Sequence, residues 1–278
     1  MSGRIYMRFA LIDNKRVEAQ PGFKGLCPGC SQQVIAKCGK QRIHHWAHLN
    51  NKSCDSWWEA ETEWHRSWKN NFPVEWQEVF LPDVITGEKH VADVCTCHDF
   101  VIEFQHSHID PKERTIREKF YKNMVWVLDG TRLKRDYPRF LKGKKDNFRS
   151  TSAQGVFLVS FPDECFPAAW IESSVPVVFD FQDIISLPTD STDTITRNIL
   201  WCLFPGRAEG SAVLAALSRE YFVNTAHNNP QLFISAAHSF VNNLANSIRQ
   251  ERQRQANIQA NMIFNQLSQR RGRRHFRC

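Results

Sequence analysis

VADVCTCHDFVIEFQHS, residues 91–107, predicts two short strands joined by a tight turn. The first strand carries one acid, Asp93, among apolar neighbours, and the second carries Glu103 in a run of β-forming residues. Side chains alternate between the faces of a strand, so Glu103 and Gln105 point the same way. Carboxylates in adjacent buried strands are unfavourable unless they are paired or bind a cation. Because hard oxygen ligands suit Mg²⁺ or Mn²⁺, the stretch predicts metal-assisted hydrolysis, for which phosphodiesters are natural substrates.

The segments around these strands predict an α/β domain over residues 57–190. The apolar run MVWVL is typical of a fully buried strand, and a helix that begins at Pro111 separates it from the acid-bearing pair. Strand, helix and strand in that order predict a parallel crossover. The expected elements are helices over 59–71 and 111–123 and strands over 74–80, 91–96, 100–105, 124–128, 155–161 and 175–181. Residues 129–152 are basic and rich in turn-forming residues.

Residues 1–56 are expected to form a separate metal-binding head. Strands flank a turn at Asp13-Asn14, and Cys27-Pro-Gly-Cys30 follows as a turn whose two thiolates can reach one tetrahedral zinc ion. Histidines then occur at positions 44, 45 and 48. His44 and His48 have the usual spacing of a zinc pair, whereas His45 and His48 are closer together in sequence. Cys38 and Cys54 are further candidate ligands, and the choice among these residues stays open at this point.

A polar stripe marks the helix before the acid-bearing strands. Glu61, His65 and Lys69 are four residues apart and share one helical face, while tryptophans supply apolar anchoring. One interpretation is a solvated stripe with an intrahelical ion pair. The position of the helix just before the acid-bearing strands favours the other interpretation, in which this face lines an active site.

The rest of the chain, residues 191–278, is expected to be helical from about Thr194 onward. Residues 249–278 hold eight arginines and one acid, in a chain of 278 residues with net charge +7. Such a basic stretch favours a phosphate-rich partner such as DNA, the alternative being a charged, solvated tail. Apolar residues at helical spacing predict a packed face, so residues 194–270 are also candidates for self-association or for a protein partner. These apolar residues are Phe233, Phe240, Leu244 and Ile248.

Composition indicates a folded cytoplasmic protein without a membrane partner. Hydrophobic residues make up 42% of the chain, which argues against disorder over most of it. No apolar run is long enough to span a bilayer, and the N-terminus lacks the pattern of a signal peptide. The nine cysteines are therefore expected to be thiols, some of them metal ligands.

The motifs in this order resemble the competence protein CoiA family, over roughly residues 25–130. The matching motifs are CPGC at 27–30, HWAH at 45–48, ExxxHxxxK at 61–69, ADV around Asp93, EFQHS at 103–107 and the MVWVL strand. The resemblance implies a restriction-endonuclease-like, or PD-(D/E)XK, nuclease domain, with a central mixed sheet flanked by helices. It also implies a small N-terminal zinc ribbon, and it favours His45 over His44, giving Cys27, Cys30, His45 and His48 as the zinc ligands with Cys54 or His44 as substitutes.

Carried over residue by residue, the resemblance makes Asp93 and Glu103 the ligands of Mg²⁺ or Mn²⁺. Glu61 is the helix acid that assists the metal through water, and His65 contacts the substrate or the metal's shell. Gln105 stands where many members of the superfamily have a catalytic lysine. Glutamine can position water but brings no charge, and Lys69 is the candidate replacement.

Three functions follow from this pattern. The leading one is a metal-dependent nuclease that hydrolyses phosphodiester bonds in DNA, in DNA processing, recombination or defence. The second is a DNA-binding protein that keeps the nuclease fold with weak or no catalysis, as Gln105 suggests. The third is a nuclease subunit that needs a partner.

Overall fold

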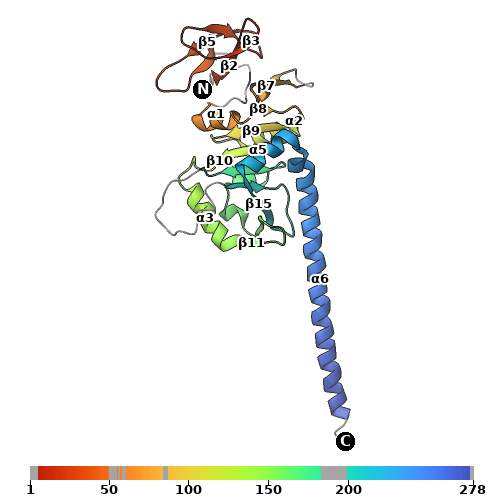
Figure 1. The fold of residues 1–278 in the computed structure, drawn as a ribbon. Coiled ribbons are helices and arrows are strands. Elements are labelled where there is room, and N and C mark those ends of the chain that lie inside the picture. The colour runs from red at the N-terminus through yellow and green to blue at the C-terminus, as the bar shows by residue number, and fades with distance from the viewer. Residues whose placement is uncertain are drawn as a thin grey trace.

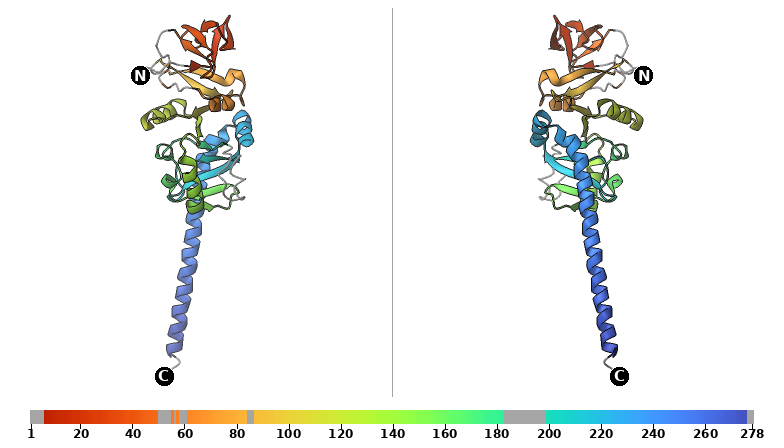
Figure 2. Two further views of the ribbon diagram at one scale, coloured as in Figure 1. Left: turned by 90° about the vertical axis from the view of Figure 1, so that its left-hand side faces the viewer. Right: turned by 90° about the vertical axis from the view of Figure 1, so that its right-hand side faces the viewer.

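The computed structural model describes residues 6–49, 55, 57, 61–83, 87–182 and 199–275. It has a small N-terminal sheet, a larger α/β body and a long C-terminal helix that projects away from the body (Figures 1 and 2). The two sheets contain six and nine strands.

The N-terminal sheet is antiparallel throughout, with strand order β1-β6-β5-β4-β2-β3. Its strands are β1 (Tyr6–Met7), β2 (Phe9–Ile12), β3 (Lys15–Glu18), β4 (Lys24–Leu26), β5 (Gln33–Lys37) and β6 (His45–His48). Asp13 and Asn14 form the expected turn between β2 and β3, with φ of 49° and 61°. These left-handed values are typical of a two-residue hairpin turn, and Asp and Asn tolerate them better than most residues.

The nine-stranded sheet has the order β11-β12-β15-β14-β13-β10-β9-β8-β7. Its strands are β7 (Gln77–Pro82), β8 (Lys89–Cys95), β9 (Val101–Gln105), β10 (Met124–Asp129), β11 (Phe148–Ser150), β12 (Val156–Val159), β13 (Val177–Asp180), β14 (Ile199–Leu203) and β15 (Ala212–Ser218). The β10 strand pairs in parallel with β9 and β13, and every other neighbour is antiparallel. The sheet is therefore mixed, and the expected parallel crossover from β9 through a helix to β10 is confirmed.

Helices cover both faces of this sheet. They are α1 (Glu63–Lys69), α2 (Pro111–Tyr121), α3 (Asp136–Asn147), α4 (Ala168–Ile171), α5 (Arg219–Asn228) and α6 (Gln231–His275), with short 3₁₀ turns η1 (Val74–Trp76) and η2 (Pro162–Glu164). One core contains Tyr121 of α2, Phe140 of α3 and Trp170 of α4. A second core, on the other face, contains Trp68 of α1 and Phe222 of α5. The core thus consists of two apolar layers, one on each side of the sheet.

Two parts of the expected secondary structure are wrong. Helix was expected from Thr194 onward, but residues 199–218 contain β14 and β15, which lie inside the large sheet. Both strands read as apolar runs, because they are buried by neighbours on both faces and lose the polar alternation that marks a strand. The basic segment 129–152, expected to be rich in turns, contains α3, whose buried Phe140 packs into the core.

The long helix α6 confirms the expectation of helix over 231–270. Its first turns pack on the body through Phe233, Val241 and Ala245, which are buried. Phe240, Leu244 and Ile248 are half-buried against the same part of the chain. The apolar stripe therefore packs against the chain's own sheet, and residues 251–265 beyond it are exposed. No helix among the described residues has the length and apolar character that crossing a membrane requires.

Candidate active site

Three acids form one row across the strands β7, β8 and β9. Gln77 and Val79 pair with Val94 and Ala92, which places Glu78 opposite Asp93. Because Val94 pairs with Ile102, the next position places Asp93 opposite Glu103. The sequence-predicted pair is therefore brought together, and Glu78 extends it by one strand.

At this row the backbone hydrogen bonds between β8 and β9 are replaced by bonds from backbone N–H groups to carboxylates. The backbone N–H of Asp93 donates to Oε1 of Glu103 at 3.2 Å. The backbone N–H of Phe104 donates to Oδ2 of Asp93 at 3.0 Å. Because a buried amide needs a partner, each carboxylate supplies the acceptor that a closed ladder would have provided. The opening fixes the two acids side by side.

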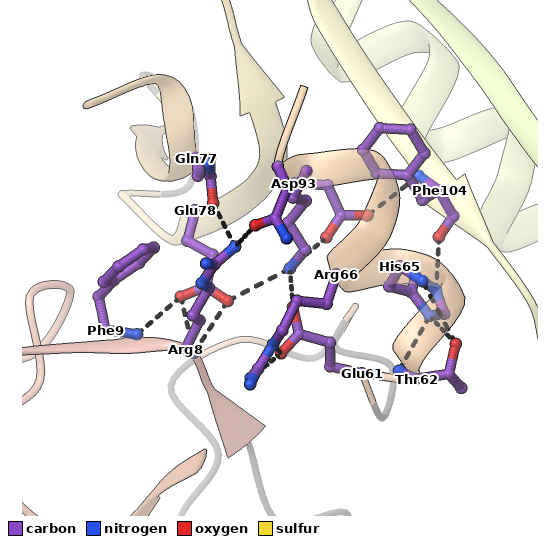
Figure 3. A network of polar contacts seen from close by, with 12 residues as sticks. Arg8, Phe9, Glu61, Thr62, His65, Arg66, Gln77, Glu78, Asp93 and Phe104 are labelled. Carbon is purple, nitrogen blue, oxygen red and sulfur yellow. Dashed lines mark hydrogen bonds and ion pairs between the residues drawn. The ribbon is translucent and has the colours of Figure 1, made fainter. Parts of the chain in front are cut away.

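Lys69 of α1 lies among three acids, which Figure 3 labels as Glu61, Glu78 and Asp93. Its Nζ is 3.0 Å from Oε1 of Glu61, 3.3 Å from Oε1 of Glu78 and 3.3 Å from Oδ1 of Asp93. The Lys69 side chain is 4% exposed, so water screens these ion pairs little. Burial lowers the pKa of Lys69, but the three carboxylates outweigh it and raise the pKa above its ordinary value. Lys69 is thus held in its charged form.

Glu61 is paired on two sides. Arg66 donates to Oε2 of Glu61 at 2.6 Å, and Lys69 approaches the other oxygen. Burial raises the pKa of Glu61, but the two cations outweigh it and lower the pKa to about 2. Glu61 is therefore ionised, and it contacts the lysine from the segment before α1. The expectation that Glu61 shares a helical face with His65 and Lys69 is wrong, because Thr62 caps the helix, which begins at Glu63.

Glu103 is the least stable anion of the group. Its side chain is 5% exposed, and Nη1 of Arg117 lies 3.3 Å from Oε2. Burial raises the pKa of Glu103 to about 8, with a further contribution from the Asp93 carboxylate, and Arg117 only partly opposes these effects. Arg117 itself divides its guanidinium among Glu103, Glu113 and the carbonyl oxygen of Trp57. An added positive charge beside Glu103 would favour its ionised form.

His65 has a role in holding α1. Thr62 caps the helix, and its backbone N–H donates to Nδ1 of His65 at 3.1 Å. Nε2 therefore carries the ring proton and donates to the carbonyl oxygen of Phe104 at 3.0 Å. Burial lowers the pKa of His65 to about 4, so the ring is neutral. Both ring nitrogens are engaged with backbone groups, and the histidine ties the start of α1 to β9.

Gln105 lies away from the acids. Its Nε2 is 3.3 Å from the carbonyl oxygen of Ser107 and 3.4 Å from Oγ of the same residue. The described residues that line the small cavity at the acids include Glu61, Lys69 and Asp93 but not Gln105. The glutamine instead lines a second cavity, farther along β9. The group that joins the acids is Lys69.

Glu78 is the residue that sequence reasoning missed. Its backbone is left-handed, with φ of 47°, a conformation that is unfavourable for a residue with a long side chain. Its carboxylate accepts from the backbone N–H groups of Arg8 and Phe9, which belong to the N-terminal sheet (Figure 3). Burial raises the pKa of Glu78, and Lys69 opposes this effect. An acid in the strand QEVF was a visible signal, but its pairing with Asp93 needed the strand register.

A second set of metal-type ligands lies in the N-terminal sheet. The ligand atoms of Cys27, Cys30 and His48 all lie within 4.8 Å of one another. Sγ of Cys30 is 3.2 Å from Nε2 of His48. Thiolates and an imidazole are donors that suit a metal such as zinc. Three of the four sequence-predicted ligands are therefore brought together.

His45 is not in this set, contrary to the ligand set Cys27, Cys30, His45 and His48. Its Nδ1 is 2.8 Å from the carbonyl oxygen of Ile43, and its ring packs on Tyr6. The reason is the strand β6, in which side chains three residues apart point to opposite faces. His44 is exposed, and Cys54 lies outside the described residues.

Comparison with known families gives two matches along the chain. Residues 14–56 match the N-terminal domain of competence protein CoiA, and residues 66–179 match its nuclease-like domain. The first match includes the cysteine and histidine set, and the second includes Lys69, Asp93 and Glu103. Searches of curated proteins and of solved structures found no significant match. The two family matches together cover more than half of the chain, which belongs to the competence protein CoiA family.

Proposed function

We propose that this chain is a metal-dependent nuclease that hydrolyses phosphodiester bonds in DNA. The observation that carries the proposal is the opened row of Glu78, Asp93 and Glu103, with Lys69 held among the acids. Buried acids on a sheet, beside a cation, form a site that can bind a divalent ion and an anionic substrate. The match of residues 66–179 to a nuclease-like domain supports the same activity.

The order of elements supports a PD-(D/E)XK core. One helix, three antiparallel strands, a second helix and a parallel strand follow each other in the chain, as α1, β7, β8, β9, α2 and β10. Asp93 and Glu103 lie on the second and third of these strands, and Glu61 lies just before the first helix. The family resemblance gave Asp93 and Glu103 the role of metal ligands, and gave Glu61 the role of an assisting acid on the helix.

The donors at the row fit Mg²⁺ or Mn²⁺ through Asp93 and Glu103. Mg²⁺ commonly takes one or two protein carboxylates and keeps several waters. The cavity at the acids has a volume of about 40 Å³, more than one water needs. Among the described residues no three acids approach each other within 4.8 Å, so water must complete the shell of an ion here. Bound at this place, such an ion lowers the pKa of water and stabilises the leaving oxygen.

The side chains around the acids fix the positions of the groups in the site. Arg117 and the backbone N–H of Asp93 fix the carboxylate of Glu103. Glu61 and Glu78 hold the ammonium of Lys69 beside Asp93. The lysine offsets the charge of the acids and brings positive charge to where a phosphodiester would lie, which is the task of the lysine usual in this superfamily.

We further propose that Cys27, Cys30 and His48 hold a structural zinc ion, with Cys54 as the fourth ligand. A small sheet with a core of few residues gains much of its stability from such an ion. The amide contacts of Arg8 and Phe9 with Glu78 then connect the zinc-binding head to the row of acids.

The test is cleavage of labelled DNA by the purified protein. Single-stranded, duplex and branched forms are incubated with Mg²⁺, with Mn²⁺ or with EDTA. We expect cleavage of at least one form with either ion and none with EDTA. Equal cleavage in EDTA, or none of any form with either ion, would contradict a metal-dependent nuclease.

The bonding of Lys69 favours a second candidate function, a nuclease-fold protein that binds DNA without cutting it. Its ammonium already balances Glu61, Glu78 and Asp93, and Gln105 lies elsewhere. In that case DNA binds equally well with and without Mg²⁺, and no form is cut. The third candidate, a nuclease subunit that needs a partner, predicts another result. Cleavage should then appear when cell extract is added and disappear in EDTA.

A further inference from the structure

A second cavity opens beside the row of acids and has no part in holding a metal. Its volume is about 220 Å³. It lies at the ends of β9, β10 and β13, which run parallel, and its lining includes Gln105, Asp129 and Phe181. In open α/β sheets, the crevice outside the carboxyl ends of parallel strands is where ligands bind.

The inner part of this cavity is aromatic. Phe166, Trp170, Phe179 and Phe181 line it, and all four are buried. The volume lies below the roughly 300–1,000 Å³ of pockets for drug-sized ligands. An occupant is therefore a single planar or apolar group, and aromatic walls favour one that stacks.

The mouth of the cavity carries more positive than negative groups, and its acid, Asp136, is already paired with Arg139. Arg132 and Arg135 line it, are exposed, and make no ion pair within the part of the chain that the structure describes. His106 also lines it, with a side chain that is 35% exposed. Positive groups around an aromatic floor match an aromatic ring that carries an anionic group.

His106 is held in place by a hydrogen bond to the buried carboxylate of Asp129. Its Nδ1 is 2.8 Å from Oδ2 of Asp129, whose side chain is 4% exposed. The other oxygen of Asp129 accepts from the backbone and hydroxyl of Thr131 and from Nε2 of Gln182. A carboxylate with this many donors orients the imidazole and leaves Nε2 of His106 for a ligand.

The two cavities adjoin along β9. Gln105 is two residues, or about 7 Å, from Glu103 along the strand. The ring of His106 is 6.0 Å, centroid to centroid, from that of His65, which lines the cavity at the acids. A phosphodiester at the acids therefore brings a neighbouring residue of the same strand to the mouth of the second cavity.

We propose that this cavity binds one unpaired nucleotide, with its base on the aromatic floor and its phosphate at Arg132, Arg135 and His106. The proposal rests on the proposed nuclease function and deepens it, because a base in this cavity cannot be stacked in a duplex. It makes single-stranded DNA, or a frayed or branched end, the substrate class.

The test is binding of dAMP and of 2-deoxyribose 5-phosphate in EDTA, by calorimetry. We expect dAMP to bind at least 10-fold more tightly than the sugar phosphate. The exposed double variant Arg132→Ala/Arg135→Ala and the single variant His106→Ala should each weaken dAMP binding, the former by at least 10-fold. The matched control Lys142→Ala/Lys145→Ala removes two exposed cations of α3 that do not line the cavity, and should change dAMP affinity less than 2-fold.

A competition then separates the substrate classes. A single-stranded hexamer should displace dAMP, and a blunt duplex of the same sequence should not. Equal affinity for dAMP and sugar phosphate, unchanged affinity in the arginine variant, or displacement by the duplex would each overturn the proposal. Binding is measured without a divalent ion, so it can be interpreted even if the protein cuts no DNA. Likewise, a failure of dAMP to bind does not affect the test of cleavage.

Discussion

The backbone N–H of Asp93 donates to the carboxylate of Glu103, which lies directly across from it on the next strand. In return, the carboxylate of Asp93 accepts from the amide of Phe104, the residue after Glu103. Each acid therefore holds the other strand open. Asn at 93 or Gln at 103 keeps an acceptor oxygen for these bonds and removes the charge, whereas Ala removes both.

The stability of the metal-free protein should fall as pH rises because of Glu103. Its pKa of about 8 in the folded protein lies above the ordinary value of 4.5, so the folded state binds more protons between these values. Stability from this group is fully present below pH 4.5 and is lost as pH rises to 8. Glu103→Gln should raise Tm in EDTA at pH 8 by several degrees, and by less at pH 5. A difference in Tm that does not depend on pH would contradict the buried, protonated acid.

Lys69→Met should destabilise the protein strongly. It leaves the buried Glu61 and Glu78 and the partly exposed Asp93 without their shared cation, and breaking a buried ion pair from one side costs about 3–5 kcal/mol. Urea unfolding at pH 7 measures this loss, with the exposed Lys145→Met of α3 as control at under about 0.5 kcal/mol. Equal stability of the two variants would mean that the lysine is not the centre of the network.

The zinc head should contain about one zinc ion per chain. Cys27→Ser and His48→Ala should lose the metal and destabilise the N-terminal sheet, because binding energy here is local folding energy. His45→Ala should keep the metal, since the ring of His45 lies outside the ligand set. Elemental analysis of freshly purified protein measures this, and loss of zinc in His45→Ala alone would reverse the assignment.

Removal of the C-terminal arginines should weaken DNA binding and make it less dependent on salt. Truncation after Ile248 keeps the packed stripe and removes eight arginines, two of which already pair with Glu209. Each arginine–phosphate interaction that the truncation removes lowers the slope of log affinity against log salt by about 0.9 on duplex DNA. Truncation after residue 269 removes five of the arginines and should give an intermediate slope.

The competing explanation is that exposed α6 joins copies of the chain. Ile258, Met262, Ile263 and Phe264 are exposed on it. Light scattering on the same truncated proteins then shows a lower mass with an unchanged salt slope, and that result would rule out phosphate binding by the arginines.

The sequence was sufficient to predict the acid-bearing strands and the helix that faces them. Asp93 and Glu103 each interrupt an apolar run, and the pattern also placed Lys69 on the helix before them. Glu61 was expected on that helix too, but it reaches Lys69 from the segment before the cap Thr62. Glu78 could not be found in this way, because its place in the row depends on strand pairing. Gln105 is two residues from Glu103 and was expected to lie at the same site. It is the last residue of β9, and its side chain lines a different cavity.

The two errors at the ends of the chain have different physical causes. His45 was preferred because HWAH resembles the family motif, but His45 and His48 lie on a strand, where an odd separation reverses the face. The strands β14 and β15 are buried by neighbours on both faces, and short apolar runs of that kind do not differ in pattern from buried helix.

The most direct test of a catalytic metal at Asp93 and Glu103 is the single-turnover rate of DNA cleavage by Asp93→Asn and Glu103→Gln at saturating Mg²⁺. Both variants keep the hydrogen bonds that open the strands, so folding should be retained, as circular dichroism can verify. Each should lower the rate at least about 100-fold, or about 2.7 kcal/mol, while the exposed Asp146→Asn of α3 keeps the parent rate. Parent rates in both site variants would contradict a catalytic metal at Asp93 and Glu103.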